Sequence, residues 1–400
     1  AVPALADAAE VFAGMQRVPG TVYVALVPTL KGAERALAAG AGELNLVMSA
    51  GQTHNLANMR MTYSFEPIPY DSRLPIIPIN DDAKSKLAHK KVTVVGCGQV
   101  GMAIAYAMLN QTTAGTIALV DMQADKLSGE AKDLQQGSAF HRNVRVEADT
   151  NYAVSSNSDL VIITAGVAQK VGESRLSLVE RNVAVMKHII PNVLAHSPNA
   201  SLCIVSNPCE IMTAVAAKIA GPSVPPGRIF GSGTCLDSSR LLSLLGRTLG
   251  VDAQSVQGYV IGEHGDSSVP VWSSVRIGGV PMLNGNEAPN EIHNSMHREV
   301  VASAGEVIVK KGYTNWAVGL TNAHIANAIV NDSLTIMPLS TCVRGIQGIE
   351  EDVFLSMPCV VGAHGVRRVI DLPLTALEKE LFHNSKDAIW KIQQGIWDSV

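Results

Sequence analysis

The stretch Val-Thr-Val-Val-Gly-Cys-Gly-Gln-Val-Gly at residues 92–101 decides the expected fold of the chain. Its first four residues favour a buried strand, and the residues that follow it are rich in alanine and methionine, as in a helix. The three glycines between them have the spacing G-x-G-x-x-G, which is informative only between a strand and a helix. The first glycine allows a tight turn, the second lets backbone approach a diphosphate, and the third lets the helix pack closely on the strand. This stretch therefore predicts a βαβ unit that binds a dinucleotide.

The end of the next expected strand carries the residue that selects the cofactor. Residues 116–121 read TIALVD, so Asp121 stands twenty positions after Gly101. A carboxylate at this place accepts hydrogen bonds from the ribose hydroxyls and repels a 2′-phosphate, which favours NAD over NADP. The alternative is a glycine turn of another α/β protein, with Asp121 merely capping a strand. The expected cofactor-binding residues are Gly96, Gly98, Gln99, Val100, Gly101, Asp121, Ala165, Gly166, Ser206 and Asn207.

Strand-like and helix-like segments alternate from Lys90 onward. Apolar runs at 159–166 and 201–207 follow the first two strands, with helices expected at 99–109 and 124–137. Such alternation predicts an α/β fold with a Rossmann-type, doubly wound parallel sheet, here over residues 89–230.

The regular alternation of strands and helices ends after about Phe230, and residues 231–400 are expected to form an α+β substrate domain. Helices are predicted at 236–249 and 290–311, and a hairpin at Gly362 and Gly365. An amphipathic terminal helix is expected to carry Leu377, Leu381, Ile389 and Ile392 on its apolar face.

The composition excludes several classes of partner. The chain has 400 residues, a formal net charge of -4 and no dense block of lysine and arginine, so no nucleic acid partner is expected. Its apolar runs are strand-sized, far below the roughly 20 residues of a membrane-spanning helix. The six cysteines are irregularly spaced without a C-x-x-C pair, which indicates reduced thiols in a cytoplasmic protein. No metal site is expected.

Four further segments carry polar and charged residues in loops or at expected strand ends. They are TAGVAQKVGESR at 164–175, VSNP at 205–208, GSGTCLDSSR at 231–240 and GEHGD at 262–266. Together and in this order they resemble the lactate/malate dehydrogenase family, and its L-lactate branch in particular. The resemblance runs from about residue 88 to residue 400, about three quarters of the chain.

The resemblance implies a reversible hydride transfer between L-lactate and NAD, giving pyruvate and NADH. Moving a hydride from C2 of lactate requires a base for the hydroxyl proton, and imidazole exchanges protons near neutral pH. The resemblance assigns that role to His264 and places the carboxylate of Asp237 on the other ring nitrogen. Arg240 lies three positions after Asp237, on the same helical face, and its planar guanidinium matches the substrate carboxylate bidentately.

The remaining substrate contacts are also implied by the resemblance. Arg175 lies in a glycine-containing loop that can close over the substrate and polarise the carbonyl of pyruvate, and Asn207 is expected to donate to the substrate oxygen. Gln169 replaces the arginine of relatives that use malate, and Thr314 lines the small side-chain pocket of lactate enzymes. A neutral amide leaves a second carboxylate unpaired, which favours lactate and leaves malate as the runner-up.

The resemblance also implies a role in glycolysis and pyruvate fermentation, and a homotetramer or, alternatively, a dimer. A different hypothesis is a dehydrogenase fold kept as a binding protein that has lost its chemistry. It predicts a damaged site, whereas His264, Asp237, Arg240 and Arg175 are all present.

The first sixty residues have a different character. Residues 23–32 and 38–41 look like a fragment of hydroxymethylglutaryl-CoA lyase, an α/β-barrel enzyme. They predict one appended βαβ unit, which cannot close an eight-stranded barrel, so lyase activity is not expected. Residues 61–88 contain prolines at 67, 69, 75 and 78, which disfavour helix and indicate an arm or linker.

Overall fold

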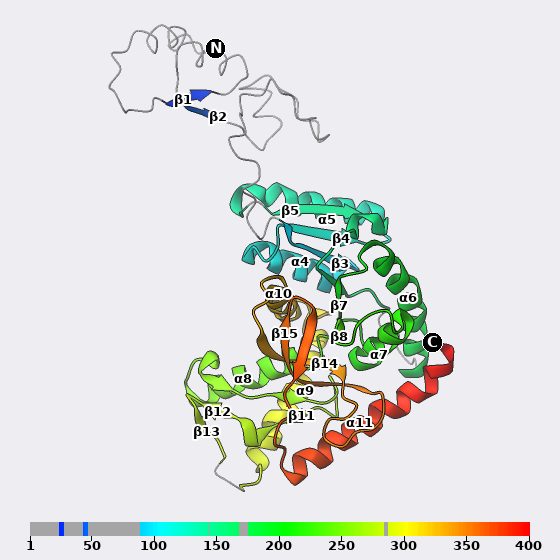
Figure 1. Ribbon diagram of the computed structural model, residues 1–400. Coiled ribbons are helices and arrows are strands. Elements are labelled where there is room, and N and C mark those ends of the chain that lie inside the picture. Colours follow the sequence, from blue (N-terminus) through cyan, green and yellow to red (C-terminus); the bar gives the residue numbers. More distant parts are fainter. Residues whose placement is uncertain (1–23, 28–42, 47–88, 143, 168–174, 284–286) are drawn as a thin grey trace. The chain divides into compact units, whose positions relative to one another are not determined.

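The computed structural model describes residues 24–27, 43–46, 89–142, 144–167, 175–283 and 287–400. The chain divides into two compact units, residues 1–83 and 84–400. In the first unit, strands β1 (Val24–Val27) and β2 (Glu43–Leu46) pair in parallel (Figure 1). The helix expected between them and the arm expected at 61–88 lie outside the described residues.

The second unit is built on one nine-stranded sheet with the order β16-β15-β14-β8-β7-β6-β3-β4-β5. Six neighbouring strands of this sheet run parallel, in the order β5-β4-β3-β6-β7-β8. The strand order changes direction between β3 and β6, and folds of this kind bind ligands at such a switch point. The predicted doubly wound parallel sheet is confirmed. These strands are β3 (Lys91–Val95), β4 (Thr116–Val120), β5 (Arg145–Asp149), β6 (Leu160–Ile163), β7 (Ser201–Ile204) and β8 (Ile229–Gly231).

Three antiparallel strands from the second half of the chain extend the same sheet: β14 (Thr335–Cys342), β15 (Phe354–Gly362) and β16 (Gly365–Val369). They join it where Ser340 of β14 pairs with Gly231 of β8. The predicted hairpin is present, since Gly362 is opposite Gly365. The sheet therefore continues across the position at which the sequence changes texture.

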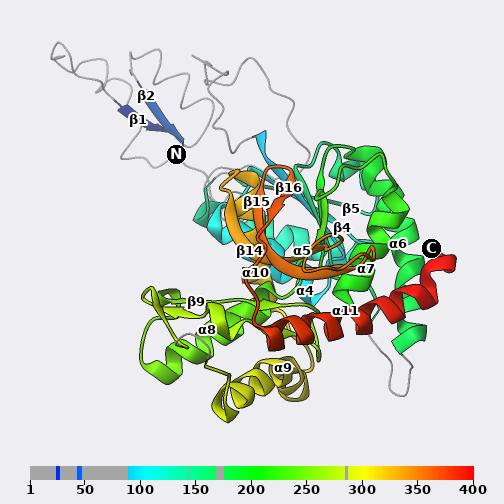
Figure 2. The same cartoon turned by 60° about the horizontal axis from the view of Figure 1, so that its bottom comes forward.

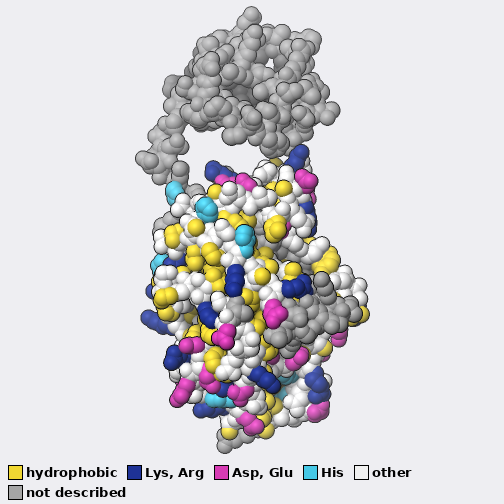
Figure 3. Space-filling view, turned by 90° about the vertical axis from the view of Figure 1, so that its right-hand side faces the viewer, with side chains coloured by type: hydrophobic (Ala, Val, Ile, Leu, Met, Phe, Trp, Pro, Cys, Tyr) yellow, Lys and Arg dark blue, Asp and Glu magenta, His cyan; other side chains and the backbone are white. Residues whose placement is uncertain are grey.

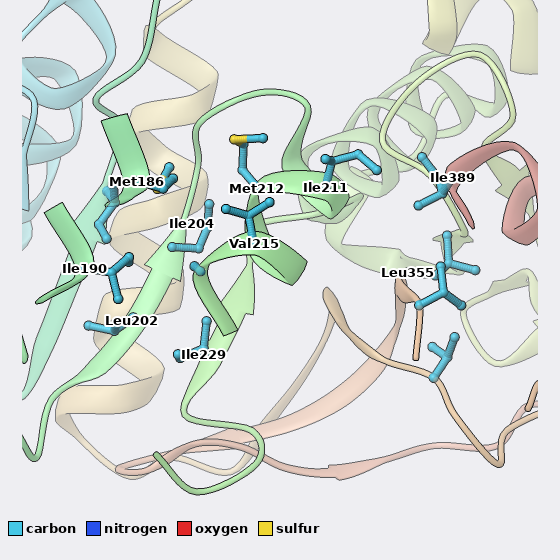
Figure 4. Packing of buried hydrophobic residues seen from close by; sticks show 14 of the residues in the cluster. Met186, Ile190, Leu202, Ile204, Ile211, Met212, Val215, Ile229, Leu355 and Ile389 are labelled. Atoms are coloured by element: carbon cyan, nitrogen blue, oxygen red, sulfur yellow. The ribbon is translucent and has the colours of Figure 1, made fainter. Parts of the chain in front are cut away.

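Alternate residues of the central strands face opposite layers of helices, as the twofold repeat of a strand requires. Val92 and Val94 belong to one buried cluster, which contains residues of α4 and α10, whereas Val95 belongs to the other, which contains residues of α6, α7 and α11. Figure 4 shows the second layer, where Met186 and Ile190 of α6 lie beside Leu202 of β7. Both faces of the parallel strands are buried, which explains their continuous apolar sequences.

The helices have the following bounds: α4 (Gln99–Gln111), α5 (Ala124–Gln136), α6 (Arg175–His196), α7 (Cys209–Ala220), α8 (Cys235–Leu249), α9 (Glu291–Lys311), α10 (Trp316–Val330) and α11 (Ala376–Ile396). The 3-10 turns are η3 (Gly137–Phe140), η4 (Tyr152–Ser155), η5 (Ala253–Ser255), η6 (Trp272–Ser274) and η7 (Trp397–Ser399). In the described part of the chain, no helix is both long and apolar enough to cross a membrane.

A smaller layer forms beside the main sheet from α8, α9 and five short strands, with its own buried cluster around Leu241, Leu245 and Trp272. Helices α8 and α9 pack together in this layer, below the sheet in Figure 2. The short strands are β9 (Val256–Gln257), β10 (Val260–Ile261), β11 (Val269–Pro270), β12 (Arg276–Ile277) and β13 (Val280–Pro281). This layer covers only part of the region 231–400 in which an α+β domain was expected, because β14, β15 and β16 belong to the main sheet.

The terminal helix α11 buries only part of the face that was expected, since Ile389 is buried and Ile392 packs against the same cluster. Leu377 and Leu381 are 48% and 42% exposed, whereas Phe382, Ile389 and Ile396 are buried. The prediction was wrong for the two leucines because the buried face follows Phe382, which packs in the layer of α6 and α7.

On the face shown in Figure 3, cationic and acidic side chains are intermixed rather than gathered by sign.

Candidate active site

The turn between β3 and α4 has the shape that its glycines predict. Gly96 has a φ of +94°, and a Cβ placed on it would lie 2.5 Å from the main-chain nitrogen of Ala165. A Cβ on Gly101 would lie 1.9 Å from the carbonyl oxygen of Gly96. A Cβ on Gly98 would meet no protein atom within 4 Å, so this glycine faces open space in front of helix α4. That space fits a diphosphate against the N-terminus of α4, whose first turn has no acidic residue.

Asp121 connects the glycine turn to the end of β4. Its two carboxylate oxygens accept hydrogen bonds from the amides of Cys97 at 2.7 Å and Gln123 at 2.9 Å. The side chain stays partly exposed, and each oxygen retains capacity for another hydrogen bond. These features fit a dinucleotide whose ribose hydroxyls donate to Asp121.

The loops after β6 and β7 are joined to this turn and to each other. Thr164 Oγ1 donates to the carbonyl of Gly96 at 2.6 Å, and Ser206 Oγ donates to the carbonyl of Ala165 at 2.6 Å. Asn182 of α6 is buried, accepts from the amide of Val167 at 2.8 Å and donates to the carbonyl of Asn207 at 2.9 Å. Asn182 was not predicted, because one polar residue within a long helix gives no local signal.

The acid–base group comes from two separate elements. Asp237 and Arg240 lie one turn apart on α8, and His264 lies in the loop after β10. His264 Nδ1 is 2.5 Å from Asp237 Oδ2, and Arg240 Nη1 donates to Asp237 Oδ1 at 2.8 Å. The carboxylate is nearly buried, whereas 26% of the His264 side chain is exposed. Asp237 therefore orients both the base and the guanidinium while the other side of the imidazole stays accessible.

The electrostatics favour the protonated form of His264. Burial alone would lower the pKa of His264, but the charge of Asp237, the hydrogen bond to it and the charge of Glu210 raise that pKa to about 9. Burial likewise tends to raise the pKa of Asp237, but His264 and Arg240 outweigh it and lower that pKa. Asp237 thus remains a carboxylate, and His264 is the group that gains and loses the proton.

The loop of His264 is held by α11. Gly262 has a φ of +84° and lies against Ser385, whose Oγ accepts a hydrogen bond from the amide of Glu263 at 2.9 Å. Ser385 is fully buried and also accepts from Ser267 Oγ at 3.1 Å. Sequence reasoning missed Ser385, which is more than a hundred residues from this loop.

Two further titratable side chains near His264 were also missed. Glu210 follows the VSNP segment, is 1% exposed and lies in the first turn of α7. His297 of α9 lies 3.0 Å from Ser268 Oγ through Nε2, and burial lowers its pKa against the opposing charge of Asp237. A carboxylate among the mostly apolar residues of the first turns of α7 was the one available signal, and it indicated Glu210.

The structure describes the surroundings of some of the expected substrate-binding residues but not of others. Asn207 is exposed at the end of β7, its bond to Pro208 is cis, and Thr314 is partly exposed in the turn between α9 and α10. Arg240 lines an open hollow of about 280 Å³ between α8 and α9, whose lining does not include His264 or Thr314. Gln169 lies outside the described residues, and Arg175 is described only as the first residue of α6. Within the described residues, no group of three or more acidic, histidine or cysteine side chains is arranged to hold a metal.

Two family models match the chain. Residues 90–231 match the lactate/malate dehydrogenase NAD-binding domain, and residues 234–396 match the α/β C-terminal domain of the same family. Similar proteins include the L-lactate dehydrogenase A chains of Caiman crocodilus apaporiensis and Alligator mississippiensis. Each is 49% identical over 312 residues, which cover 77% of this chain and 93% of the relative.

Proposed function

The chain belongs to the lactate/malate dehydrogenase family, and from that premise we propose how its residues carry out the reaction. It is an NAD-dependent oxidoreductase that interconverts L-lactate and pyruvate. The observation that carries the proposal for the site is the contact of His264 Nδ1 with the nearly buried carboxylate of Asp237. It supports a base with a fixed ring orientation beside a positioned guanidinium.

The turn of Gly96, Gly98 and Gly101 would hold the diphosphate of NAD, and Asp121 its ribose. When bound, NAD supplies the hydride acceptor, and NADH the donor. In lactate oxidation, Nε2 of His264 accepts the hydroxyl proton, and Asp237 stabilises the imidazolium that forms. In pyruvate reduction, the same nitrogen returns the proton to the carbonyl oxygen.

Arg240 is proposed to bind the substrate carboxylate. Its Nη1 is engaged by Asp237 in the described contacts, and a guanidinium has five N–H donors, so a bidentate contact with a carboxylate is compatible with this pair. Asn207 would donate to the substrate oxygen from the end of β7. Arg175 would polarise the carbonyl when the loop that precedes α6 closes.

Selection of lactate over malate is assigned to Gln169 and Thr314. A neutral amide at 169 offers no charge partner to the second carboxylate of oxaloacetate, and burial of an uncompensated charge is costly. Thr314 would border the small pocket for the methyl group. Malate with oxaloacetate, and a broader tolerance of 2-oxo acids, remain the alternatives.

We further propose a homotetramer, or a dimer, in the cytoplasm. Exposed apolar residues gather near the junction of α9 and α10, as expected of a surface covered by another subunit; they include Val309, Trp316 and Leu320, which are 86%, 63% and 59% exposed. All six cysteines are free thiols, which suits a reducing compartment. Light scattering on the purified protein tests the assembly, and a monomeric mass would contradict it.

The deciding experiment follows NADH absorbance with pyruvate and, separately, with oxaloacetate. The wild-type protein is compared with His264→Ala, which removes the proposed base. We expect turnover of pyruvate, little turnover of oxaloacetate, and a loss of roughly 10²- to 10⁴-fold in the variant. Unchanged NADH binding by the variant would show that the loss concerns proton transfer.

Two results would contradict parts of this assignment. A preference for oxaloacetate would mean that Gln169 does not select against the second carboxylate. No turnover with either substrate would favour a binding protein that retains the fold.

A further inference from the structure

Glu210 is a buried carboxylate to which the proton transfer described above gives no role. It is 1% exposed and is the second residue of α7, in the sequence Cys-Glu-Ile-Met-Thr-Ala-Val-Ala-Ala. A carboxylate so deeply buried costs free energy unless it is paired or hydrogen bonded. Its partners therefore indicate what it does.

The contacts of Glu210 lead to the loop that bears His264. Ser356 Oγ of β15 donates to Glu210 Oε1 at 3.4 Å. The main-chain amide of His264 is among the groups that lower the pKa of this carboxylate. Ser356 in turn exchanges two main-chain hydrogen bonds of 2.9 Å with Gly262. The carboxylate thus contacts Ser356, the residue that pairs with the loop of His264.

The titratable and charged groups around this pair come from α7, α8, the loop of His264 and α9, whose His297 is acted on by the charge of Asp237. Asp237 and Arg240 of α8 and Glu210 of α7 act on His264, while His264 and Glu263 of its own loop act on Glu210. Arg240 is bonded to Asp237. In the described part of the site, a protonated His264 is therefore stabilised by two carboxylates: Asp237 contacts its ring nitrogen, and Glu210 acts on it from α7 through its charge.

We propose that Glu210 is a positioning residue for His264: through Ser356 it supports the loop of the base and, through its negative charge, it stabilises the protonated imidazole that donates the proton to pyruvate while NADH donates the hydride. This inference rests on the proposed function of His264 as the proton donor. It adds a second buried carboxylate, from a different helix, to the one that contacts the ring.

The pKa directions agree with this geometry. Burial raises the pKa of Glu210 to about 7, although the charge of His264 and the main-chain amides of Glu210 and His264 oppose the rise. Glu210 is in turn among the groups that raise the pKa of His264. Each residue favours the charged form of the other, so removal of the carboxylate must make His264 lose its proton at lower pH.

The test is the pH profile of Glu210→Gln, which removes the charge and keeps nearly the same shape. We expect the pH at which kcat/KM for pyruvate reduction falls to half its maximum to move down by about one unit. The loss would be about tenfold on the alkaline side and small at low pH. A purely structural role would lower the rate without moving this midpoint.

Two matched variants separate charge from shape. Glu210→Asp keeps the charge and should restore most of the wild-type midpoint. Glu263→Gln removes the neighbouring carboxylate, which raises the pKa of Glu210, so it should leave the midpoint of His264 in place or move it up. An unchanged midpoint in Glu210→Gln, or an equal downward shift in Glu263→Gln, overturns the proposal.

If Glu210→Gln does not fold, Ser356→Ala takes its place. It removes the hydroxyl that donates to Glu210 and should move the midpoint down by a smaller amount; an unchanged midpoint then overturns the proposal. Failure of the proposed function is distinguishable, because in that case the wild-type protein does not reduce pyruvate at any pH.

Discussion

The two halves of the site are held in different ways. The turn after β3 is fixed by main-chain geometry: Gly96 has a positive φ, and Gly101 approaches its carbonyl too closely for any side chain. The loop of His264 is fixed by buried side chains from other elements: Asp237 contacts the imidazole, and Ser385 accepts a hydrogen bond from the amide of Glu263. The glycine turn is therefore held by steric constraints on the main chain, whereas the loop of His264 is held by hydrogen bonds and charges.

This difference determines how each half responds to change. Cys97, inside the glycine turn, is kept as a neutral thiol because burial raises its pKa to about 12. This thiol of the cofactor turn should therefore stay neutral throughout the working pH range. His264 gains and loses its proton in the working pH range, so substitutions around it should shift the pH profile of kcat/KM.

The largest effect is expected from Asp237→Asn. The variant keeps the shape but removes the charge that raises the pKa of His264, and it weakens the pairing with Arg240. We expect kcat for pyruvate reduction at neutral pH to fall on the order of 10³-fold, because an oriented acid–base group contributes about that much. Stopped-flow measurement of NADH oxidation provides the rate, and fluorescence titration should show that NADH still binds. A loss below tenfold would mean that this carboxylate is dispensable.

A smaller effect, independent of pH, is expected from Gly98→Ala. The φ of Gly98 is −78°, and a Cβ there meets no protein atom, so the fold should tolerate alanine. The added methyl enters the space assigned to the diphosphate, and crowding of about 1–3 kcal/mol would weaken NADH binding roughly 10- to 100-fold.

Gly129→Ala is the matched control, because Gly129 is exposed within α5 and also has open space around it. Calorimetric titration with NADH should find it unchanged. Equal weakening in both variants would remove the steric account of the glycine turn.

The wild-type pH profile sharpens the comparison further. Because the pKa of His264 is raised from 6.5 to about 9, kcat/KM for pyruvate reduction should hold to about pH 9 and then fall about tenfold per unit. Lactate oxidation, which needs neutral imidazole, should rise over the same range. The free energy of unfolding should decrease from about pH 6.5 to about pH 9, since the folded state binds the proton more tightly. A midpoint near 6.5 would contradict the electrostatic account.

The parts of the site that the sequence predicted have their determinants close together. Gly96 to Gly101 are nearly consecutive, and Asp237 and Arg240 are one helical turn apart. The pairing of Asp237 with His264 came from the family resemblance, because 27 positions separate the two residues and nothing local joins them.

The supporting residues could not be predicted because the fold, rather than the spacing, brings them together. Ser385 lies 122 positions after Glu263, and Ser356 lies 146 positions after Glu210. The exposure of Leu377 and Leu381 has the same origin, since the face that α11 buries depends on α6 and α7. The sequence around Ser385 in α11 therefore gives no indication that this residue contacts the loop of His264.

The smallest effect is expected from Ser385→Ala, which acts on the second half of the site without touching its charges. The substitution leaves the amide of Glu263 without its acceptor, a loss of about 1–3 kcal/mol in the free energy of unfolding. The adjoining His264 would be less well oriented, so kcat should fall a few-fold while the alkaline midpoint stays in place. Chemical denaturation and the pH profile measure the two quantities. Ser223→Ala, which alters an exposed hydroxyl of a surface turn, is the control and should change neither. Ser385→Ala could instead move the alkaline midpoint of the pH profile down, as Glu210→Gln is expected to do. That result would mean that the position of the loop and the charge of Glu210 cannot be distinguished by their effects on the pKa of His264.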